Sequence, residues 1–464
     1  MLMTDVMILA AGLGTRMKSR RAKVLHELAG RPLIAHIVKA ATLLAPDAII
    51  TVVGHQAEAV EEAVRLESAR LIERGGAARP GLEFVFQADQ RGTGHAVMAA
   101  RDKLNGRSGP LVVIAGDVPM IESQTLGRLA DAHVSEQNAV TVLTVRLEDP
   151  TGYGRIIRDS EGGFVRCVEQ KDASAEELQE REVSVSIYCF DIPALLEALG
   201  ELTTHNAQGE YYLTDVPRIM HERGKRVGIV THHDPAEVSG VNTRIELAEL
   251  ERKLRERKLR ELMLSGVTII DPATTYVHED VEIGQDTVIH PQVIIEGRSR
   301  IGTGCTINSW TRLKDVEVGD DVTIRNSTVI EDSVIGNGAT IGPFARLRMK
   351  AEIGDKAGIG NFVEVKKSKI GRGTKASHLT YLGDATLGER VNIGAGTVTC
   401  NYDGVRKHET VIEDDVKIGS DTMLVAPVRV GRGSVTGAGS VVTKDVPPDS
   451  LVTGVPAVVR KKLK

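Results

Sequence analysis

The chain has 464 residues and a net charge of −5, from 58 Lys plus Arg and 63 Asp plus Glu. This balance argues against a protein that coats nucleic acid, because a phosphate backbone demands a basic surface. No apolar run approaches the roughly 20 residues of a membrane span, and the N-terminus lacks the basic region of a signal peptide. We therefore expect a cytoplasmic protein of two or three domains that binds neither nucleic acid nor membrane.

Short apolar runs alternate with segments of helical spacing in the first half of the chain. Strands are predicted at residues 6–10, 48–53, 84–87 and 111–115, and helices at residues 33–44 and 57–69. This alternation predicts an α/β domain with a doubly wound, Rossmann-like and mostly parallel sheet. Ligands of such a sheet bind at the carboxyl ends of its strands, so the residues that follow each strand are the candidates for chemistry.

A glycine-rich turn, LAAGLGTRM, follows the first predicted strand at residues 9–17. Its glycines let backbone N–H groups approach phosphate oxygens, and Arg16 adds a permanent cation. Lys23, in the run KVLH, supplies a second cation for a phosphate. A plain strand–helix turn and a surface lysine are the structural alternatives, because the run matches neither a Walker loop nor G-x-G-x-x-G.

Two further polar segments follow predicted strands. The run QADQRGTGHA at residues 87–96 offers amide and backbone groups suited to the edge of a nucleotide base. Asp117 comes directly after the strand that ends at Ala115. A carboxylate there suits Mg²⁺, which takes one or two protein oxygens and completes its shell with phosphates and water. A helix N-cap is the alternative role of Asp117; the glycine turn and Lys23 favour the metal.

Residues 244–263 are predicted to form one long amphipathic helix, RIELAELERKLRERKLRELM, in which Leu and Ile alternate with Glu and Arg. Its charges are interpreted as the solvated face of a spacer. We therefore predict an N-terminal α/β domain at 1–242, a linker helix at 243–265 and a C-terminal domain at 266–464.

An aliphatic residue recurs every six residues in the C-terminal domain, often with glycine directly after it. The series runs through 283, 289, 295, 301 and 307, then 335, 341, 347, 353 and 359, then 412, 418, 424 and 430. This hexapeptide period predicts a left-handed parallel β-helix, in which six residues form one flat face and the aliphatic side chain points inward. So narrow an interior has no room for rings, which fits an aromatic content of 3%.

Two segments break the phase of the repeat, at residues 366–385 and 400–411. We expect both to be inserted surface loops that carry function. The first contains His378 and Tyr381, and histidine titrates where the base for an amine should. A structural histidine is the alternative. Nearby cations suited to a sugar phosphate are Arg346, Arg348, Lys366 and Lys367.

Eight motifs occur in the order seen in sugar-1-phosphate nucleotidyltransferases: LAAGLGTRM, KVLH, QADQRGTGHA, AGDVP, DPTGYGRI, VEQKDA, NAQGEYYLTD and GVNTR. With its hexapeptide half, the whole chain resembles the bacterial bifunctional N-acetylglucosamine-1-phosphate uridyltransferase/glucosamine-1-phosphate acetyltransferase family. The resemblance implies acetyl transfer from acetyl-CoA to glucosamine-1-phosphate, then Mg²⁺-dependent uridylyl transfer from UTP to N-acetylglucosamine-1-phosphate with release of pyrophosphate. It also implies a homotrimer whose product, UDP-N-acetylglucosamine, supplies peptidoglycan and lipopolysaccharide.

By the same resemblance, Arg16 and Lys23 match the family's catalytic cations, and Asp117 and Asn242 match its metal ligands. The residues implied to hold UTP and the product are Leu9, Ala10, Ala11, Gly12, Lys23, Gln87, Gly92, Thr93, Ala115, Gly116, Asp117, Gly154, Glu169, Ser184 and Asn242.

In the β-helix, the motifs FARLR, FVEVKK, HLTYLGDA and CNYDG resemble the family's acetyltransferase site, which implies that His378 is the base. The residues implied to bind glucosamine-1-phosphate are Arg348, Lys366, Tyr381 and Asn392. Those implied to bind acetyl-CoA are Ala395, Asn401, Tyr402, Ser420 and Ala438.

The chain departs from the family's pattern at three places. Ala22 stands where the family usually has proline before the KVLH lysine, and we expect it to loosen that loop. Ser184-Val185-Ser186 replaces an Asn-Thr-Gly turn that binds the sugar, so contact with the N-acetyl group is weakened. A coenzyme-binding arginine usual near the tail TGVPAVVRKKLK is absent, and Arg460 and Lys461 are the candidates to replace it.

Other functions fit the sequence less well. A monofunctional nucleotidyltransferase with a structural or regulatory β-helix would not need HLTYLGDA. A zinc enzyme of the γ-carbonic-anhydrase kind needs three ligands, and the histidines lack that spacing. A non-catalytic scaffold would not keep two sets of site motifs. Within the bifunctional hypothesis, Cys400 offers a covalent acetyl-enzyme route as the alternative to direct transfer.

Overall fold

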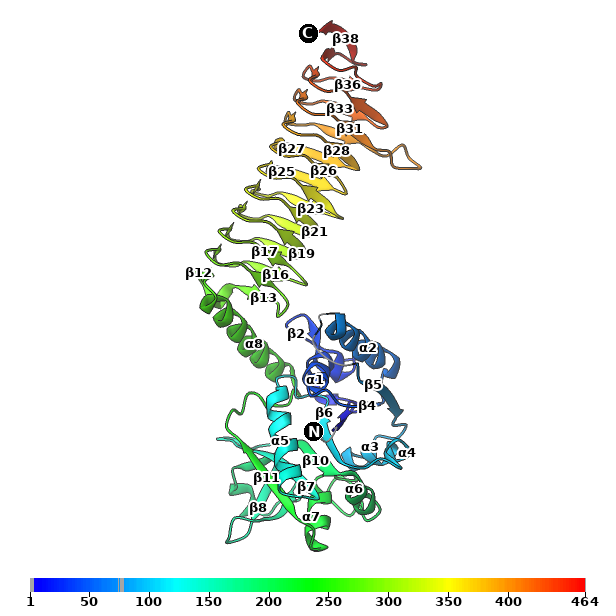
Figure 1. The fold of residues 1–464 in the computed structure, drawn as a ribbon, viewed down its shortest axis with the longest axis vertical. Helices are drawn as coiled ribbons and strands as arrows, with labels where there is room; N and C mark the ends of the chain where they lie inside the picture. The colour runs from blue at the N-terminus through cyan, green and yellow to red at the C-terminus, as the bar shows by residue number, and fades with distance from the viewer. Residues whose placement is uncertain (1–3, 74, 76–78, 464) are drawn as a thin grey trace. The chain divides into compact units, whose positions relative to one another are not determined.

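The computed structural model describes residues 4–73, 75 and 79–463. The chain divides between Arg252 and Lys253 into two compact units (Figure 1). Among the described residues, no helix has the length and apolar character needed to cross a lipid bilayer.

The N-terminal unit is built on a mixed sheet with the strand order β11-β7-β10-β6-β1-β4-β5. The bounds of these strands are Val227–His232, Val140–Arg146, Glu182–Asp191, Pro110–Ala115, Asp5–Leu9, Ala48–Val53 and Gly81–Phe86. The strands β6, β1, β4 and β5 are parallel neighbours, as are β11 and β7, whereas β10 runs antiparallel to both β6 and β7. Two shorter strands, β8 (Gly154–Arg158) and β9 (Phe164–Val168), extend the sheet beside β10.

Helices cover both faces of this sheet, which confirms the doubly wound prediction. Alternate residues of β1 point to opposite faces: Val6 and Ile8 belong to one buried cluster, and Met7 belongs to another. The first cluster includes residues of α1 (Leu33–Thr42), α2 (Ala57–Glu73) and α5 (Ser123–Ser135). The second includes residues of α3 (Thr93–Ala99), α4 (Arg101–Leu104), α6 (Ile192–Leu199) and α7 (Asp215–Glu222).

The predicted linker helix is α8 (Arg244–Leu264). Leu250, Leu254, Leu259 and Leu262 are buried, as its stripe predicts, and the last two join the apolar core of the C-terminal unit. Ile245, placed in the same stripe from the sequence, is 72% exposed. The stripe therefore begins one turn later than predicted.

The C-terminal unit is a left-handed parallel β-helix that runs from β12 (Thr268–Ile269) to β38 (Val458–Lys462). The short strands up to β37 (Ser450–Thr453) pair in parallel with strands of neighbouring coils, and the coils stack along the axis (Figure 1). The last strand, β38, pairs antiparallel with β37. Every aliphatic residue of the predicted six-residue series is at most 9% exposed and belongs to one continuous core. The prediction of a hexapeptide solenoid is confirmed.

The predicted insertion at 366–385 is wrong. These residues form ordinary coil strands, β26 (Lys369–Ile370), β27 (Lys375–Gly383) and the start of β28 (Ala385–Leu387). Gly358 pairs with Lys375, so this coil has 17 residues, whereas the coil that pairs Thr340 with Gly358 has 18. A coil shortened by one residue breaks the sequence phase as an insertion would.

The predicted insertion at 400–411 is confirmed. It lies between β30 (Val398–Cys400) and β31 (Thr410–Ile412), where strand partners are 25 residues apart. The added residues form a hairpin that leaves the solenoid, drawn in orange in Figure 1 and closed by a bridge between Tyr402 and Lys407.

The corners of the β-helix are turned by residues with positive φ, and one corner differs from the others. It carries four exposed apolar side chains with φ between 45° and 64°: Trp310, Phe344, Phe362 and Leu379. The Phe344 and Phe362 rings stack with centroids 5.2 Å apart. We call these four residues the apolar corner. The corner that precedes it along the coil turns on residues such as Gly338, Lys356 and Gly373.

Candidate functional site

A cavity of about 590 Å³ opens in the N-terminal unit, and its wall includes the carboxyl ends of β1 and β6. Its position is the one predicted from the strand order. Of the residues implied to hold nucleotide and sugar, Ala10 alone does not line the cavity; it is 2% exposed, and its N–H donates to the Val52 carbonyl at 2.8 Å.

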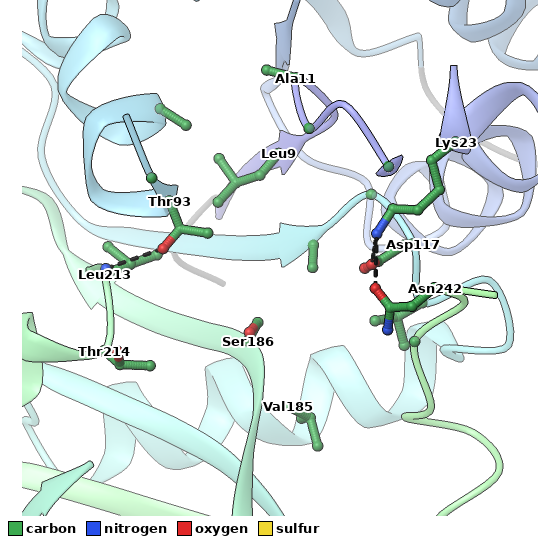
Figure 2. A pocket seen from close by; sticks show the side chains of 18 of the residues that line it. Leu9, Ala11, Lys23, Thr93, Asp117, Val185, Ser186, Leu213, Thr214 and Asn242 are labelled. Carbon is green, nitrogen blue, oxygen red and sulfur yellow. Dashed lines mark hydrogen bonds and ion pairs between the residues drawn. The ribbon is translucent and has the colours of Figure 1, made fainter. Parts of the chain in front are cut away.

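Two cations and two acceptor oxygens converge at one side of this cavity. The Lys23 ammonium donates to Asp117 Oδ2 and, at 3.2 Å, to Asn242 Oδ1. Arg16 Nη2 donates to the same Asn242 oxygen at 2.8 Å. Figure 2 shows Lys23 reaching from its loop to Asp117 and Asn242, which come from segments far apart in the sequence. The structure therefore brings together the predicted catalytic cations and the predicted metal ligands.

Local backbone features bring Lys23 to this point. Gly14 has φ 61°, and a side chain on it would begin 2.5 Å from Lys23 Cβ, so only glycine allows this approach. Ala22 keeps a φ of −55°, close to the value that proline imposes. Its N–H donates to Gln56 Oε1 at 2.8 Å, a bond that proline cannot make. The alanine that replaces proline is therefore held in place by a hydrogen bond that proline lacks.

The predicted base-reading segment lies on another part of the wall. Gln87 is 3% exposed, and its amide nitrogen lies 3.3 Å from the Gly92 carbonyl and 3.1 Å from His95 Nδ1. Thr93 Oγ1 accepts the backbone N–H of Leu213 at 3.1 Å, a bond drawn in Figure 2. These contacts fix the amide and the loop that we expect to face the base.

The predicted sugar contacts Glu169 and Ser184 are half-buried and buried, respectively, and both are within hydrogen-bonding distance of other side chains. Glu169 Oε1 accepts the Thr214 hydroxyl at 2.9 Å, and burial raises the pKa of Glu169. The Ser184 hydroxyl lies 3.1 Å from the Tyr188 hydroxyl, so its hydrogen-bonding capacity is partly used inside the protein. Ser186 has φ 56°, a left-handed conformation that explains why glycine is usual here. Sequence reasoning missed Tyr188 and Thr214, which also line the cavity.

In the β-helix, strand register brings the predicted sugar-phosphate cations together. Arg348 of β23 (Arg346–Arg348) pairs with Lys366 of β25 (Gly358–Lys366) on the next coil. The Lys366 ammonium lies 3.6 Å from Asp384 Oδ2, and Asn401 Nδ2 donates to the same oxygen at 2.6 Å. Asn401 begins the inserted hairpin, so the insertion adds directly to this cluster.

Lys407, on the same hairpin, is a residue that sequence reasoning missed. Its side chain lies against Lys366, whose charge lowers the pKa of Lys407. Two adjacent ammonium groups favour an anionic ligand between them. The only sequence signal for Lys407 is its place in an insertion.

His378 does not join this cluster. It is exposed, and it pairs with Asn361 near one end of β27, whereas Gly383, which pairs with Lys366, ends that strand five residues later. Leu379, with φ 45°, turns a corner between them, so the two ends of β27 lie on different faces of the coil. Tyr381 lies between them, and its partners are Glu364 and Val398. Asn392, in β29 (Asn392–Ile393), pairs with Lys375 and Lys417 on another face.

The residues implied to bind acetyl-CoA follow the solenoid axis. The Ala395 carbonyl accepts the Asp421 N–H at 2.7 Å, and the Ser420 carbonyl accepts the Gly439 N–H at 2.8 Å. Ala395, Ser420 and Ala438 therefore occupy equivalent places on successive coils, and we call them the coenzyme ladder. Tyr402 is 61% exposed on the hairpin. Cys400 is half-buried, and burial raises the pKa of its thiol, which disfavours the thiolate that a covalent route needs.

Arg460 reaches back toward the end of this ladder. Leu451 pairs with Lys461 and Val452 with Val459, so Arg460 lies at a register shift in β38. A bulge of this kind re-aims a side chain. Arg460 Nη2 lies 3.9 Å from where a side chain on Gly454 would begin. The Gly454 carbonyl accepts the Val441 N–H at 3.1 Å, next to the coil that holds Ala438.

Family models match both units. Residues 6–263 match the MobA-like NTP transferase domain, residues 272–349 match the GMPPB C-terminal domain, and residues 409–444 match the bacterial transferase hexapeptide of six repeats. The nucleotidyltransferase and hexapeptide transferase predictions are therefore confirmed.

Curated relatives match the chain over almost its whole length, and each is named bifunctional protein GlmU. The relative from Syntrophomonas wolfei is 46% identical over 447 residues, which is 96% of each chain. The one from Trichlorobacter lovleyi is 47% identical over 97% of this chain and 95% of its own. The one from Heliobacterium modesticaldum is 47% identical over 98% and 95%. The chain thus belongs to the GlmU family of bifunctional enzymes, which carry a uridylyltransferase and an acetyltransferase in one polypeptide.

Proposed function

We propose that the cavity transfers the uridylyl group of UTP to N-acetylglucosamine-1-phosphate, and that the β-helix first acetylates glucosamine-1-phosphate with acetyl-CoA. The observation that carries the first half is the convergence of Lys23, Arg16, Asp117 and Asn242. In the cytoplasm of a bacterium, the product UDP-N-acetylglucosamine supplies peptidoglycan and, in Gram-negative cells, lipopolysaccharide.

Mg²⁺ fits the donor set at this point. The Asp117 carboxylate and the Asn242 side-chain oxygen both contact the single Lys23 ammonium, so the two oxygens are aimed at one positive charge. Carboxylate and amide oxygens suit Mg²⁺, with substrate phosphates and water as its remaining ligands. When bound, the ion neutralises phosphate charge.

The chain's own groups account for the rest of uridylyl transfer. A phosphate oxygen of the sugar phosphate attacks the α-phosphorus of UTP, and the bond to pyrophosphate breaks. Lys23 and Arg16 hold the two anions close and neutralise the charge that their approach concentrates. Leu9, Ala11, Gly12, Gln87, Gly92 and Thr93 hold the nucleotide, and Gly154, Glu169 and Ser184 hold the sugar.

For acetyl transfer, His378 accepts a proton from the substrate amine as its nitrogen attacks the thioester carbon; the carbon–sulfur bond breaks, and the departing sulfur of coenzyme A takes up that proton to leave as the thiol. Arg348, Lys366 and Tyr381 hold the sugar phosphate, and we add Lys407 to this set. The raised pKa of Cys400 supports direct transfer over an acetyl-enzyme. Arg460, beside Gly454, is the candidate to replace the missing coenzyme-binding arginine.

The apolar corner supports a homotrimer. Its four side chains are between 51% and 64% exposed, and exposed clusters of this kind mark protein interfaces. His378 directly precedes Leu379 of this corner. A neighbouring copy seated there would cover the corner of β27 between His378 and Tyr381 and would help to complete the acetyltransferase site.

An assay with two readouts tests the assignment. Purified protein receives glucosamine-1-phosphate, acetyl-CoA, UTP and Mg²⁺, and free thiol and pyrophosphate are followed separately. We expect His378→Ala to lower thiol release by about 10²–10⁴ and to leave pyrophosphate release from N-acetylglucosamine-1-phosphate unchanged. A wild-type protein that never releases thiol would mean that the β-helix has no transferase activity.

A further inference from the structure

The segment that carries Asn242 is held at both ends by hydrogen bonds. On its N-terminal side, the Val241 N–H donates to the Asp117 carbonyl at 2.8 Å. A side chain on Gly240 would begin 3.7 Å from the Asp117 carboxylate, so this stretch passes directly beside it. On its C-terminal side, Asn242 is followed by Thr243 and then by α8, which begins at Arg244.

The first turn of α8 is closed by a capping box. Glu246 Oε2 accepts the backbone N–H of Asn242 at 2.6 Å and that of Thr243 at 2.7 Å. In return, the Glu246 N–H donates to Thr243 Oγ1 at 3.2 Å. This is the reciprocal pattern of a Thr-x-x-Glu box, which satisfies donors that the helix leaves free. Here Glu246 also accepts the backbone N–H of Asn242, the residue that precedes the N-cap Thr243.

Charge strengthens this arrangement. The Glu246 carboxylate lies in the first turn of α8, where the helix dipole favours a negative group. Hydrogen bonds to an ionised carboxylate are shorter and stronger than neutral ones, which agrees with distances of 2.6 and 2.7 Å. Arg244, the first residue of α8, donates from Nε to the Met17 carbonyl at 3.4 Å, next to Arg16.

We propose that the Thr243–Glu246 capping box is a positioning element for uridylyl transfer, which aims the Asn242 side-chain oxygen at the metal by holding its backbone. The proposal rests on the metal role proposed above for Asn242. Glu246 is a positioning residue, because it acts only through the backbone of Asn242 and Thr243. Its loss should weaken metal binding more than turnover at saturating metal.

The test uses the full-length protein and three substitutions of glutamate in α8. Glu246→Ala removes the acceptor, and Glu246→Gln keeps an acceptor oxygen without the charge. Glu249→Ala removes an exposed glutamate from the same helix and is the matched control. Mn²⁺ is titrated into each protein with UDP-N-acetylglucosamine present, and the free ion is followed by electron paramagnetic resonance. The Mg²⁺ concentration for half-maximal pyrophosphate release is measured in parallel.

We expect Glu246→Ala to weaken Mn²⁺ binding and to raise the half-saturating Mg²⁺ concentration by about fivefold, the equivalent of losing a helix cap of about 1 kcal/mol. At saturating Mg²⁺, kcat should stay within about twofold of wild type. Glu246→Gln should retain most of the affinity, and Glu249→Ala all of it. Thiol release by the β-helix should be unchanged in every variant.

Two results would overturn the proposal. One is a fall in kcat with unchanged metal affinity; the other is a parallel loss of thiol release, which would indicate general damage to α8. Asn242→Ala separates this proposal from the one on which it rests. If Asn242→Ala leaves Mn²⁺ binding intact, the metal role of Asn242 is wrong; if it abolishes binding and Glu246→Ala does not weaken it, only the capping-box proposal fails.

Discussion

The two units of this chain prepare their sites in different ways. In the N-terminal unit, Lys23, Asp117 and Asn242 come from distant segments and already contact one another in one chain. In the β-helix, His378 and Gly383, the residue that pairs with Lys366, lie on opposite sides of the corner that Leu379 turns. A doubly wound sheet gathers strand ends at one edge. A solenoid instead repeats one position per coil, so its sites extend along a corner and depend on what packs against that corner.

Making the apolar corner polar is the strongest test of this difference between the two units. We expect Phe344→Asp with Phe362→Asp to weaken self-association on the order of 10³-fold, because two buried aromatic anchors are lost. Acetyl transfer should fall with it, and uridylyl transfer should persist. Light scattering and the two-readout assay check this. Lys356→Asp, at a positive φ on another corner, is the control. Full acetyl transfer by a monomeric variant would refute the contrast.

Removing Lys23 tests the other side of the comparison. We expect Lys23→Ala to lower kcat/KM for pyrophosphate release by about 10²–10³, the effect of losing one preorganised group that stabilises transition-state charge. Thiol release should not change, because this site lies in one unit. Arg20→Ala removes an exposed cation from the same loop and should leave pyrophosphate release unchanged. A loss below tenfold would show that Lys23 is not central.

The paired ammonium groups of Lys366 and Lys407 predict a pH dependence of substrate binding. Lys366 lowers the pKa of Lys407, and only the protonated form attracts a sugar phosphate. The KM for glucosamine-1-phosphate should therefore rise as pH increases through that lowered pKa. We expect Lys407→Ala to raise KM by about tenfold at neutral pH. Lys407→Arg should keep a low KM to higher pH, because arginine stays charged. Identical profiles for wild type and the arginine variant would contradict this role.

The smallest expected effect concerns Arg460. Because this side chain is exposed, we expect Arg460→Ala to raise the KM for acetyl-CoA by no more than about fivefold. The KM for S-acetylpantetheine, which lacks the nucleotide and its phosphates, should be unchanged. Lys461→Ala is the matched control from the same strand. An equal rise for both acetyl donors would show that Arg460 does not recognise the phosphates.

Most of the fold was predictable because each pattern has one physical cause. Every sixth aliphatic side chain must point inward, so residues such as Ile307 and Ile341 reveal the solenoid. The phase break near His378 was ambiguous, because a coil of 17 residues and an inserted loop look alike in one sequence. Only the register of Gly358 with Lys375 separates them.

Site residues that belong to a recognisable sequence motif were predictable. Residues whose role depends on contacts with distant parts of the sequence were harder to predict. Fourteen of the fifteen implied nucleotide and sugar contacts line the cavity, because strand ends and glycine turns fix them. Lys407 and Tyr188 were missed, since nothing local distinguishes a hairpin lysine or a buried tyrosine. The Thr-x-x-Glu spacing of the Thr243–Glu246 box is visible in the sequence. The hydrogen bond from the Asn242 N–H to Glu246 is seen only in the folded structure.

The residues of the coenzyme ladder lie one coil apart, so each further coil of sequence extends the ladder by a fixed distance along the solenoid axis. Neighbouring strands lie about 4.8 Å apart, so the three coil steps from Ala395 to the Gly454 turn cover roughly 14 Å along the axis. A long, flexible donor that binds along this corner would meet the protein at fixed intervals. Inserting or deleting one whole coil would then change the length of donor that fits without disturbing the core, and a repeat array could acquire a preference for donors of another length in a single duplication.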